Sequence, residues 1–486
     1  MKFPKFLLLF LIIGLSFTQI IAQNGNHDNH IREIENNLLP QIAVEGEAIS
    51  SWNIADRMAF HAVPGVSIAF FDDGKIQWTR AYGHLSVDRL RKVDEKTLFQ
   101  AASISKPVAA LGALTLVENG KLDLDKNVNS YLKTWRIPSN KFTESNAITF
   151  RNLVTHTGGL TVHGFRGYAS TEKVPSTIEV LNGEKPANSD AILTDTFPGS
   201  IWRYSGGGYT VGQLAISDIS GQAFDDFMKE HVLEPIEMTR STYTQPLPEV
   251  MRDNVAIGHR GNGVQVEGLW HTYPEQAAAG LWTTPSDLAK MAIAIQNAYN
   301  KSEDEVIEPT TAKAMLTKHL GDWGLGFGLN GEADSLTFGH GGANEGYRCN
   351  LFAFANQGQG VAIMTNGDNG GALYMEILRS MSKTYGWNTY HTQLKKTIEL
   401  SEDELSKFEG LYEFGPNKEI KLRLSISDGH LFAHQIWNDI KYQVFPEAQL
   451  RFFAGTDGTP FEFTVDQQGK VEKMIADGQF EMKKIE

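Results

Sequence analysis

The spacing of apolar residues changes along the chain, and the change divides it into two regions. Before about residue 395 the apolar runs are long and are separated by polar and glycine-rich stretches. Nearer the C-terminus apolar residues fall at every second position, as at Ile420, Leu422, Leu424 and Ile426. This alternation, with short turns between the runs, is typical of antiparallel strands. We therefore predict a small all-β domain over residues 400–486.

The larger region begins and ends with predicted strands and has helices between them. Residues 63–83 are expected to form two strands around an Asp73-Gly74 turn, and residues 336–367 three strands separated by glycine-rich turns. The expected helices are a long apolar one ending near Gly120, a short one within 148–160, one from about Tyr209 to Ser220, one within 278–296, and one from about Ala372 to Tyr385. The pattern indicates one sheet made from distant segments, flanked by helices, together with a helical subdomain.

The N-terminus has the anatomy of a secretory signal peptide. Lys2 and Lys5 precede an apolar run that is too short to span a bilayer comfortably, and Ala22 offers a cleavage point. An uncleaved membrane anchor is the alternative. The predicted segments are a signal peptide over 1–22, a polar leader over 23–45 with a disordered "HDNH" at 27–30, a main domain over 46–395, and the β domain over 400–486. We expect an exported protein, periplasmic or secreted, with no membrane span after cleavage of the signal.

Composition narrows the functional classes further. The net charge is −14 and no basic run stands out, which argues against a nucleic-acid partner. With a single cysteine, Cys349, the chain has no internal disulfide, and we expect this residue to be a small buried hydrophobe rather than a nucleophile. The sequence contains no metal-binding motif. We therefore expect no metal and no cofactor, and a small-molecule or peptide substrate; the sequence leaves the oligomeric state open.

A serine followed three residues later by a lysine can supply a nucleophile and its base, because the two side chains share one face of a helix. The chain contains four such pairs, which are Ser103/Lys106, Ser130/Lys133, Ser170/Lys173 and Ser380/Lys383. Only Ser103 stands where an extended segment enters a long apolar helix. Burial beneath that helix would lower the pKa of the Lys106 amine, as a base requires. The alternative for Ser103 is a plain helix N-cap.

Four segments occur in a fixed order along the chain: "AASISKPVAALGALTLVENGKLDLD", "LVTHTGGL", "RYSGGGYTVG" and "FGHGGANEGYR". Together they resemble the penicillin-binding-protein-like serine hydrolases, the superfamily of class C β-lactamases, over about residues 50–385. The resemblance implies a mixed α/β (α+β) fold, with an antiparallel sheet flanked by helices and a helical subdomain. It also implies that Ser103 is the acylated nucleophile, with Lys106 beside it, and that Tyr204 is the tyrosine of the family's Tyr-x-Asn motif.

The last of these segments matches the family's Lys-Thr-Gly strand, which in relatives is often His-x-Gly, at His340, Gly341 and Gly342. The resemblance implies an oxyanion hole formed by the backbone N–H groups of Ser103 and Ala343. The residues expected to contact substrate are Gly206, Gly341, Gly342 and Asn344. A tyrosine phenol can act as a base when cations flank it, and we expect Lys106 and His340 to supply that charge.

Two residues depart from the family pattern and bear on the substrate. Gly206 stands where the pattern usually has Asn, so a side-chain amide that could hold a substrate amide is missing. His340 replaces the lysine common in β-lactamases, so a permanent positive charge for a substrate carboxylate is missing too. We therefore expect a serine hydrolase acting on an ester, a lactone or a D-amino-acid peptide. The alternatives are a D-Ala-D-Ala carboxypeptidase or weak β-lactamase, and a non-catalytic binding protein on the same fold.

Overall fold

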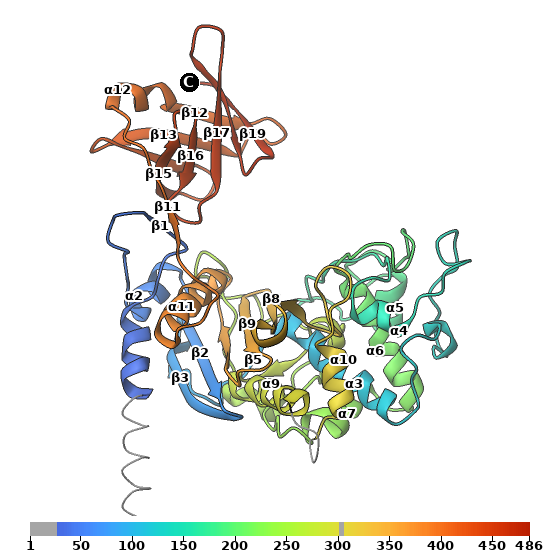
Figure 1. Cartoon of the computed structure of the whole chain (residues 1–486). Coiled ribbons are helices and arrows are strands. Elements are labelled where there is room, and N and C mark those ends of the chain that lie inside the picture. Colours follow the sequence, from blue (N-terminus) through green and yellow to red (C-terminus); the bar gives the residue numbers. More distant parts are fainter. Residues whose placement is uncertain (1–26, 301–305) are drawn as a thin grey trace, which may run out of the picture. The chain divides into compact units, whose positions relative to one another are not determined.

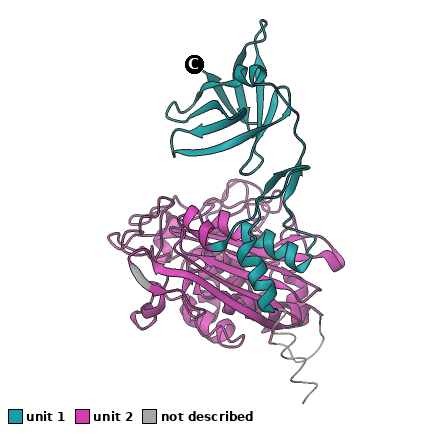
Figure 2. Ribbon diagram, turned by 90° about the vertical axis from the view of Figure 1, so that its left-hand side faces the viewer, with its two compact units in different colours: residues 1–54, 375–486 teal, residues 55–374 magenta. Residues whose placement is uncertain are grey.

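The computed structural model describes residues 27–300 and 306–486. It divides into two compact units (Figure 2). The larger unit is formed by residues 55–374, and the smaller one joins the described part of the first 54 residues to residues 375–486. The predicted signal peptide lies outside the described residues. Within the described ranges, the chain has no helix whose length and apolar character would let it cross a bilayer.

A seven-stranded antiparallel sheet forms the centre of the larger unit, with strand order β4-β3-β2-β10-β9-β8-β7 (Figure 1). The strands are β2 (Gly65–Asp72), β3 (Lys75–Ser86), β4 (Arg89–Lys92), β7 (Gly328–Asn330), β8 (Thr337–Asn344), β9 (Tyr347–Phe354) and β10 (Gly360–Thr365). Asp73 and Gly74 both have positive φ, as a tight turn between β2 and β3 requires. The pairing of β2 with β10 confirms one sheet built from distant parts of the chain.

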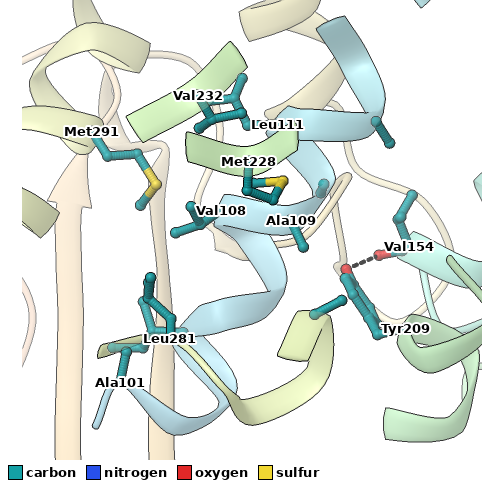
Figure 3. Close-up of a cluster of buried hydrophobic side chains, with 14 of the residues drawn as sticks. Ala101, Val108, Ala109, Leu111, Val154, Tyr209, Met228, Val232, Leu281 and Met291 are labelled. Carbon is teal, nitrogen blue, oxygen red and sulfur yellow. Dashed lines mark hydrogen bonds between the residues drawn. The ribbon is translucent and has the colours of Figure 1, made fainter. Parts of the chain in front are cut away.

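Helices complete the larger unit. They are α2 (Ile54–Phe60), α3 (Ser105–Glu118), α4 (Phe150–Val154), α5 (Thr177–Asn182), α6 (Gly206–Ser220), α7 (Phe224–Met228), α8 (Gln276–Ala279), α9 (Pro285–Asn300) and α10 (Pro309–Met315). Helix α9 packs against β2, β3, β9 and β10. Helix α3 is buried almost all round and packs against Met228 and Val232 (Figure 3). A Cβ atom at Gly112 would lie 2.3 Å from the Met228 sulfur, so a glycine lets the two helices approach.

An eight-stranded closed barrel forms most of the smaller unit and confirms the predicted all-β domain. Its strands are β12 (Gly410–Phe414), β13 (Lys421–Ser427), β14 (His430–Gln435), β15 (Ile440–Ala448), β16 (Arg451–Ala454), β17 (Pro460–Val465), β18 (Val471–Ala476) and β19 (Phe480–Lys484). Phe408, Phe452 and Phe463 pack edge-to-face in its core. Outside the barrel, β1 (Ile42–Val44) pairs in parallel with β11 (Gln393–Lys395).

The structure corrects the prediction for the leader. Residues 27–36 are helical, and residues 42–44 belong to β1. Ile31 and Ile34 are buried, at 4% and 3% exposure, and the His30 ring packs edge-on against Tyr385. The expectation of disorder at 27–30 is therefore wrong, because two apolar residues three positions apart give this polar segment a buried helical face. The smaller unit also takes in residues 375–385 of α11 (Gly370–Tyr385), whereas the sequence analysis places residues up to 395 in the main domain.

Candidate active site

Ser103 lies at a sharp bend between a strand and a helix. The strand β5 (Phe99–Gln100) ends just before it, Ala102–Ile104 form one 3₁₀ turn (η1), and α3 begins at Ser105. Ala102 has a φ of 49°, a left-handed conformation that is uncommon for a residue with a side chain. The Ser103 hydroxyl makes no capping hydrogen bond, since the N-cap of α3 is Ile104. The bend instead presents Ser103 to its neighbours.

Lys106 is the immediate neighbour of the Ser103 hydroxyl. Its Nζ donates to Ser103 Oγ at 2.9 Å and to the carbonyl oxygen of Ala278 in α8 at 2.7 Å. The side chain is only 2% exposed, and this burial lowers the pKa of the amine to about 7. A substantial fraction of Lys106 is therefore neutral at neutral pH. A neutral amine at this distance can accept the serine proton.

The other Ser-x-x-Lys pairs do not form this contact. The hydroxyls of Ser130 and Ser380 donate to the main-chain carbonyls of Asn127 and Ile34. Lys133 donates to the carbonyl of Asp218. Over the described part of the chain, Ser103 is the only one of the four serines hydrogen-bonded to the lysine that follows it.

Tyr204 stands directly before helix α6. Ser205 is the N-cap of this helix, and its Oγ accepts a hydrogen bond from the Gly208 N–H at 3.0 Å. The helix therefore starts at Gly206, three residues before the predicted start at Tyr209. A Cβ atom on Gly207 would lie 2.7 Å from the Thr161 carbonyl oxygen. The glycines thus form a first helical turn whose backbone packs closely against the preceding loop.

The Tyr204 hydroxyl lies 3.5 Å from Nε2 of His340. Nδ1 of His340 lies 2.5 Å from the Gly341 carbonyl oxygen, which can only accept, so Nδ1 carries the proton and Nε2 is the acceptor for Tyr204. Burial, with a further contribution from Lys106, lowers the pKa of His340 to about 3. Burial also raises the pKa of Tyr204 well above its usual value, although an interaction with Ser103 opposes this rise.

These values change the expected charge of the site. At neutral pH His340 is neutral, so the expectation that it supplies a cation beside Tyr204 is wrong. The physical reason is that His340 is only 9% exposed and lies close to a second positive group. The cation that remains near Tyr204 is Lys106, whose Nζ is 4.9 Å from the centre of the tyrosine ring.

Strand β8 brings the predicted oxyanion residue Ala343 to the same pocket. β7 pairs only with Thr337–Gly339, so the rest of this strand edge is free to face η1. A Cβ atom on Gly342 would lie 2.3 Å from the Ala101 carbonyl oxygen, so glycine is needed for the strand to pass this close. A Cβ atom on Gly341 would meet nothing nearer than 3.9 Å. The two glycines therefore differ, because Gly342 makes room for protein and Gly341 leaves room in the pocket.

A pocket of about 600 Å³ joins these residues. The predicted residues that line it are Ser103, Lys106, Tyr204, His340, Gly341, Gly342, Ala343 and Asn344. The Asn344 amide nitrogen donates to Gln100 and to the Ala279 carbonyl, so this side chain also fixes the pocket floor. The roles of these lining residues in oxyanion binding and substrate binding stay predictions.

Gly206 is buried and does not line the pocket. A Cβ atom there would lie 3.1 Å from the His163 carbonyl oxygen and 3.1 Å from the Phe165 ring. The segment 163–165 therefore stands beside the position where the family pattern has an asparagine side chain.

Sequence reasoning missed several residues of the pocket wall. His163, Gly164 and Phe165 come from a loop-rich segment with no periodic pattern, and nothing in its spacing marks it. Arg348, in contrast, is the last residue of the segment "FGHGGANEGYR", so its place in this family-like segment could have marked it as a pocket residue. Tyr374 comes from the first turns of α11. Cys349 is fully buried, as predicted, and its sulfur lies 3.0 Å from the Ala101 carbonyl oxygen.

Comparison with known proteins agrees with this geometry. A family model described as Beta-lactamase matches residues 53–381. "Protein flp" of Staphylococcus aureus (strain MW2) is 26% identical over 229 residues, which are 46% of this chain and 42% of that protein, so the chain spans less than half of that relative's length. Penicillin-binding protein 4 of Amycolatopsis lactamdurans is 23% identical over 342 residues, 66% of this chain and 85% of that protein.

Solved structures show the same fold. The octameric penicillin-binding protein homologue from Pyrococcus abyssi has a TM-score of 0.61 at 22% identity, covering 88% of this chain and 98% of the homologue. SurE has a TM-score of 0.55 at 21% identity, covering 89% of this chain and 97% of SurE. The family model spans more than half of the sequence. The chain therefore belongs to the Beta-lactamase family, within the superfamily of penicillin-binding-protein-like serine hydrolases.

Proposed function

We propose that this protein hydrolyses an ester, lactone or D-amino-acid peptide through an acyl-enzyme formed on Ser103. The observation that carries the proposal is the 2.9 Å hydrogen bond between Lys106 Nζ and Ser103 Oγ, made by an amine whose pKa burial lowers to about 7. A nucleophile and a base in contact, at a bend that faces a pocket, are what acyl transfer requires.

Acylation starts from the neutral form of Lys106. The amine takes the proton of Ser103 as Oγ attacks the substrate carbonyl carbon. The N–H groups of Ser103 and Ala343 hold the developing oxyanion, and such a donor contributes about 3 kcal/mol to transition-state stabilisation. Tyr204 then gives its proton to the leaving group and recovers one from the Lys106 ammonium. The leaving group departs protonated, Lys106 is neutral again, and the acyl group remains on Ser103.

Deacylation repeats the same proton movements with water. Neutral Lys106, acting with Tyr204, takes a proton from a water molecule that attacks the acyl carbonyl. The ester bond to Ser103 breaks, and Oγ recovers the proton from Lys106. The products are the free acid and the original enzyme. His340, which accepts a hydrogen bond from the Tyr204 hydroxyl, orients that hydroxyl through both steps.

Two other functions remain to be separated from this one. A D-Ala-D-Ala carboxypeptidase or weak β-lactamase would use the same acyl-enzyme with a different substrate. A non-catalytic binding protein would have no acyl-enzyme at all. The contact between Ser103 and Lys106, with Tyr204 in the same pocket, favours the catalytic functions.

Intact-mass spectrometry with a fluorophosphonate probe tests the proposal. We expect one adduct on the wild-type chain and none on Ser103→Ala. Absence of an adduct on the wild type would contradict acyl-enzyme chemistry, and an adduct that persists in Ser103→Ala would place the nucleophile elsewhere. Labelled penicillin, D-Ala-D-Ala peptides and simple esters, compared on the wild type, then assign the substrate.

A further inference from the structure

Arg348 lines the catalytic pocket, yet the proposed acyl chemistry does not use it. It lies on β9 directly across from Ala343 on β8. Side chains of residues paired across an antiparallel ladder project from the same face of the sheet. The Arg348 side chain therefore leaves the sheet on the same face as that of Ala343, whose N–H is the proposed oxyanion donor. Tyr374 and Gly371 of α11 line the same pocket.

Few other side chains in the pocket keep a charge over the whole relevant pH range. Among the residues that the structure describes, no aspartate or glutamate lines the pocket, so none of these lining residues carries a negative charge at neutral pH. Lys106 has a pKa of about 7 and His340 one of about 3, so both are mostly neutral in mildly alkaline solution. A guanidinium keeps its charge at any pH that the protein experiences. Of the pocket-lining residues in the described part of the chain, Arg348 is therefore the one with a permanent positive charge.

One guanidinium nitrogen holds Arg348 in place. Nη1 donates to the carbonyl oxygens of Asn344 and Tyr347, at 2.7 and 2.8 Å, and lies 3.0 Å from a carboxylate oxygen of Asp368. Asp368 in turn accepts a hydrogen bond from the Gly346 N–H at 2.9 Å. Among the described residues, Nε and Nη2 have no hydrogen-bond partner, and the side chain is 28% exposed. This free edge of the guanidinium has the geometry that binds a carboxylate through two parallel hydrogen bonds.

We propose that Arg348 binds a carboxylate of the substrate, so that the enzyme prefers acyl compounds with a free carboxylate near the scissile bond over matched neutral ones. The inference rests on the proposed function at Ser103. Arg348 would also replace the permanent positive charge that is missing at His340, because it lies on the neighbouring strand β9. The substrate class is a short peptide, depsipeptide or thioester that ends in a carboxylate.

A matched pair of thioesters measures this preference. N-acetyl-D-alanyl thioglycolate carries a carboxylate on its leaving group, and the corresponding thioglycolamide does not. Release of the thiol gives kcat/KM for each, and the acid-to-amide ratio is the readout. We expect the wild-type ratio to exceed one, and Arg348→Gln to lower it about tenfold, as expected for a charged hydrogen-bonded pair. Arg348→Lys, which keeps the charge but loses the fork, should give an intermediate ratio.

Two further variants separate recognition from structure. Asp368→Asn removes the negative charge that competes for Arg348, so it should raise the ratio, whereas damage to the fold would not. Arg151 is a matched control, because it is similarly exposed and paired with Asp125 outside the pocket. Arg151→Gln should leave the ratio unchanged. If Arg348→Gln slows both thioesters equally, the proposal is wrong and Arg348 only supports the hairpin.

A binding measurement decides the question independently of turnover. Calorimetry on Ser103→Ala, with N-acetyl-D-alanyl-D-alanine and its C-terminal amide as ligands, should show the acid binding about tenfold more tightly. The difference should vanish in Ser103→Ala/Arg348→Gln. Equal binding of acid and amide would overturn the Arg348 proposal. Failure of the wild type to form a probe adduct would instead overturn the proposed function.

Discussion

The candidate active site and the C-terminal barrel bury very different side chains. In the larger unit, Lys106, His340 and Glu275 are 2%, 9% and 0% exposed, and burial shifts the pKa of each in the direction that favours the neutral form, for Glu275 to about 8. Among the described residues after Ser382, no aspartate, glutamate, lysine, arginine or histidine is buried to this extent, and the barrel core is mainly aromatic and aliphatic. Burying ionisable groups costs stability. The larger unit accepts that cost at Lys106 and His340, which line the candidate active site, whereas the described barrel core buries no amine, imidazole or carboxylate.

The strongest test of this contrast is to replace the buried amine. Lys106→Met removes the proposed base of Ser103 and should lower the rate of fluorophosphonate labelling about 10³-fold. Because a desolvated amine is replaced by an apolar chain, the free energy of unfolding should stay equal or rise. Lys133→Met is the control, since Lys133 belongs to a Ser-x-x-Lys pair without the contact, and its labelling rate should match wild type. A labelling rate near wild type in Lys106→Met would contradict the assignment of the base.

The converse test is made in the barrel. Phe452 is fully buried and contacts Phe408 and Phe463, so Phe452→Ala should destabilise the smaller unit by about 3–5 kcal/mol. Denaturant titration measures this loss. Phe480→Ala, at a position 45% exposed, should change stability by less than about 1 kcal/mol. The comparison between the units breaks down if Phe452→Ala slows labelling of Ser103 under conditions where the larger unit remains folded.

Within the pocket, the neighbouring glycines Gly341 and Gly342 of β8 are expected to respond differently to substitution by alanine. Gly342→Ala forces a Cβ atom against the Ala101 carbonyl oxygen and displaces β8 from the Ser103 turn. A displacement of about 1 Å at a catalytic centre costs about 10²-fold in rate. The Cβ atom of Gly341→Ala would lie 3.9 Å from the Cys349 carbonyl oxygen, which is an ordinary van der Waals contact, so this variant should cost clearly less. Steady-state kcat/KM for both variants on one ester measures the difference. Equal losses of kcat/KM in the two variants would show that the close approach of β8 to η1 does not require a glycine at position 342.

The smallest of these effects is the dependence of labelling on pH. Only the neutral form of Lys106 can accept a proton, and its pKa is about 7. The rate should therefore rise about tenfold per pH unit below 7 and level off above it. Labelling between pH 5.5 and 9 checks the profile. A flat profile across this range would mean that Lys106 does not titrate as the base.

Short-range patterns in the sequence predicted the contact between Ser103 and Lys106, which the structure contains; their roles as nucleophile and base stay predictions. Ser103 and Lys106 meet because residues three apart in one helical turn share a face, and sequence alone displays that spacing. The Asp73-Gly74 turn and the alternation after Ile420 are likewise local signals, and both elements formed as expected. The start of α6 was misplaced by three residues, because a run of glycines looks unfavourable for a helix until Ser205 is recognised as its cap.

What the sequence could not show depends on neighbours from elsewhere in the chain. The charge of His340 depends on burial and on Lys106, which lies in a different part of the sequence. The closure of the barrel depends on pairing between its first and last strands, β12 and β19. The position beside Gly206 is filled by residues 163–165, a loop with no periodic pattern. Each of these contacts requires the folded structure.

The left-handed backbone conformation of Ala102 sets conformational entropy against strain at the residue directly before Ser103, the proposed nucleophile. A glycine there would adopt a φ of 49° without strain, and the alanine instead costs about 1–2 kcal/mol. However, the backbone of alanine has far fewer accessible conformations than that of glycine, so the orientation of the Ser103 side chain is more restricted. Ala102→Gly should thus unfold at an equal or higher temperature while labelling more slowly. The methyl group of Ala102 would then lower the stability of the protein while orienting Ser103 more precisely.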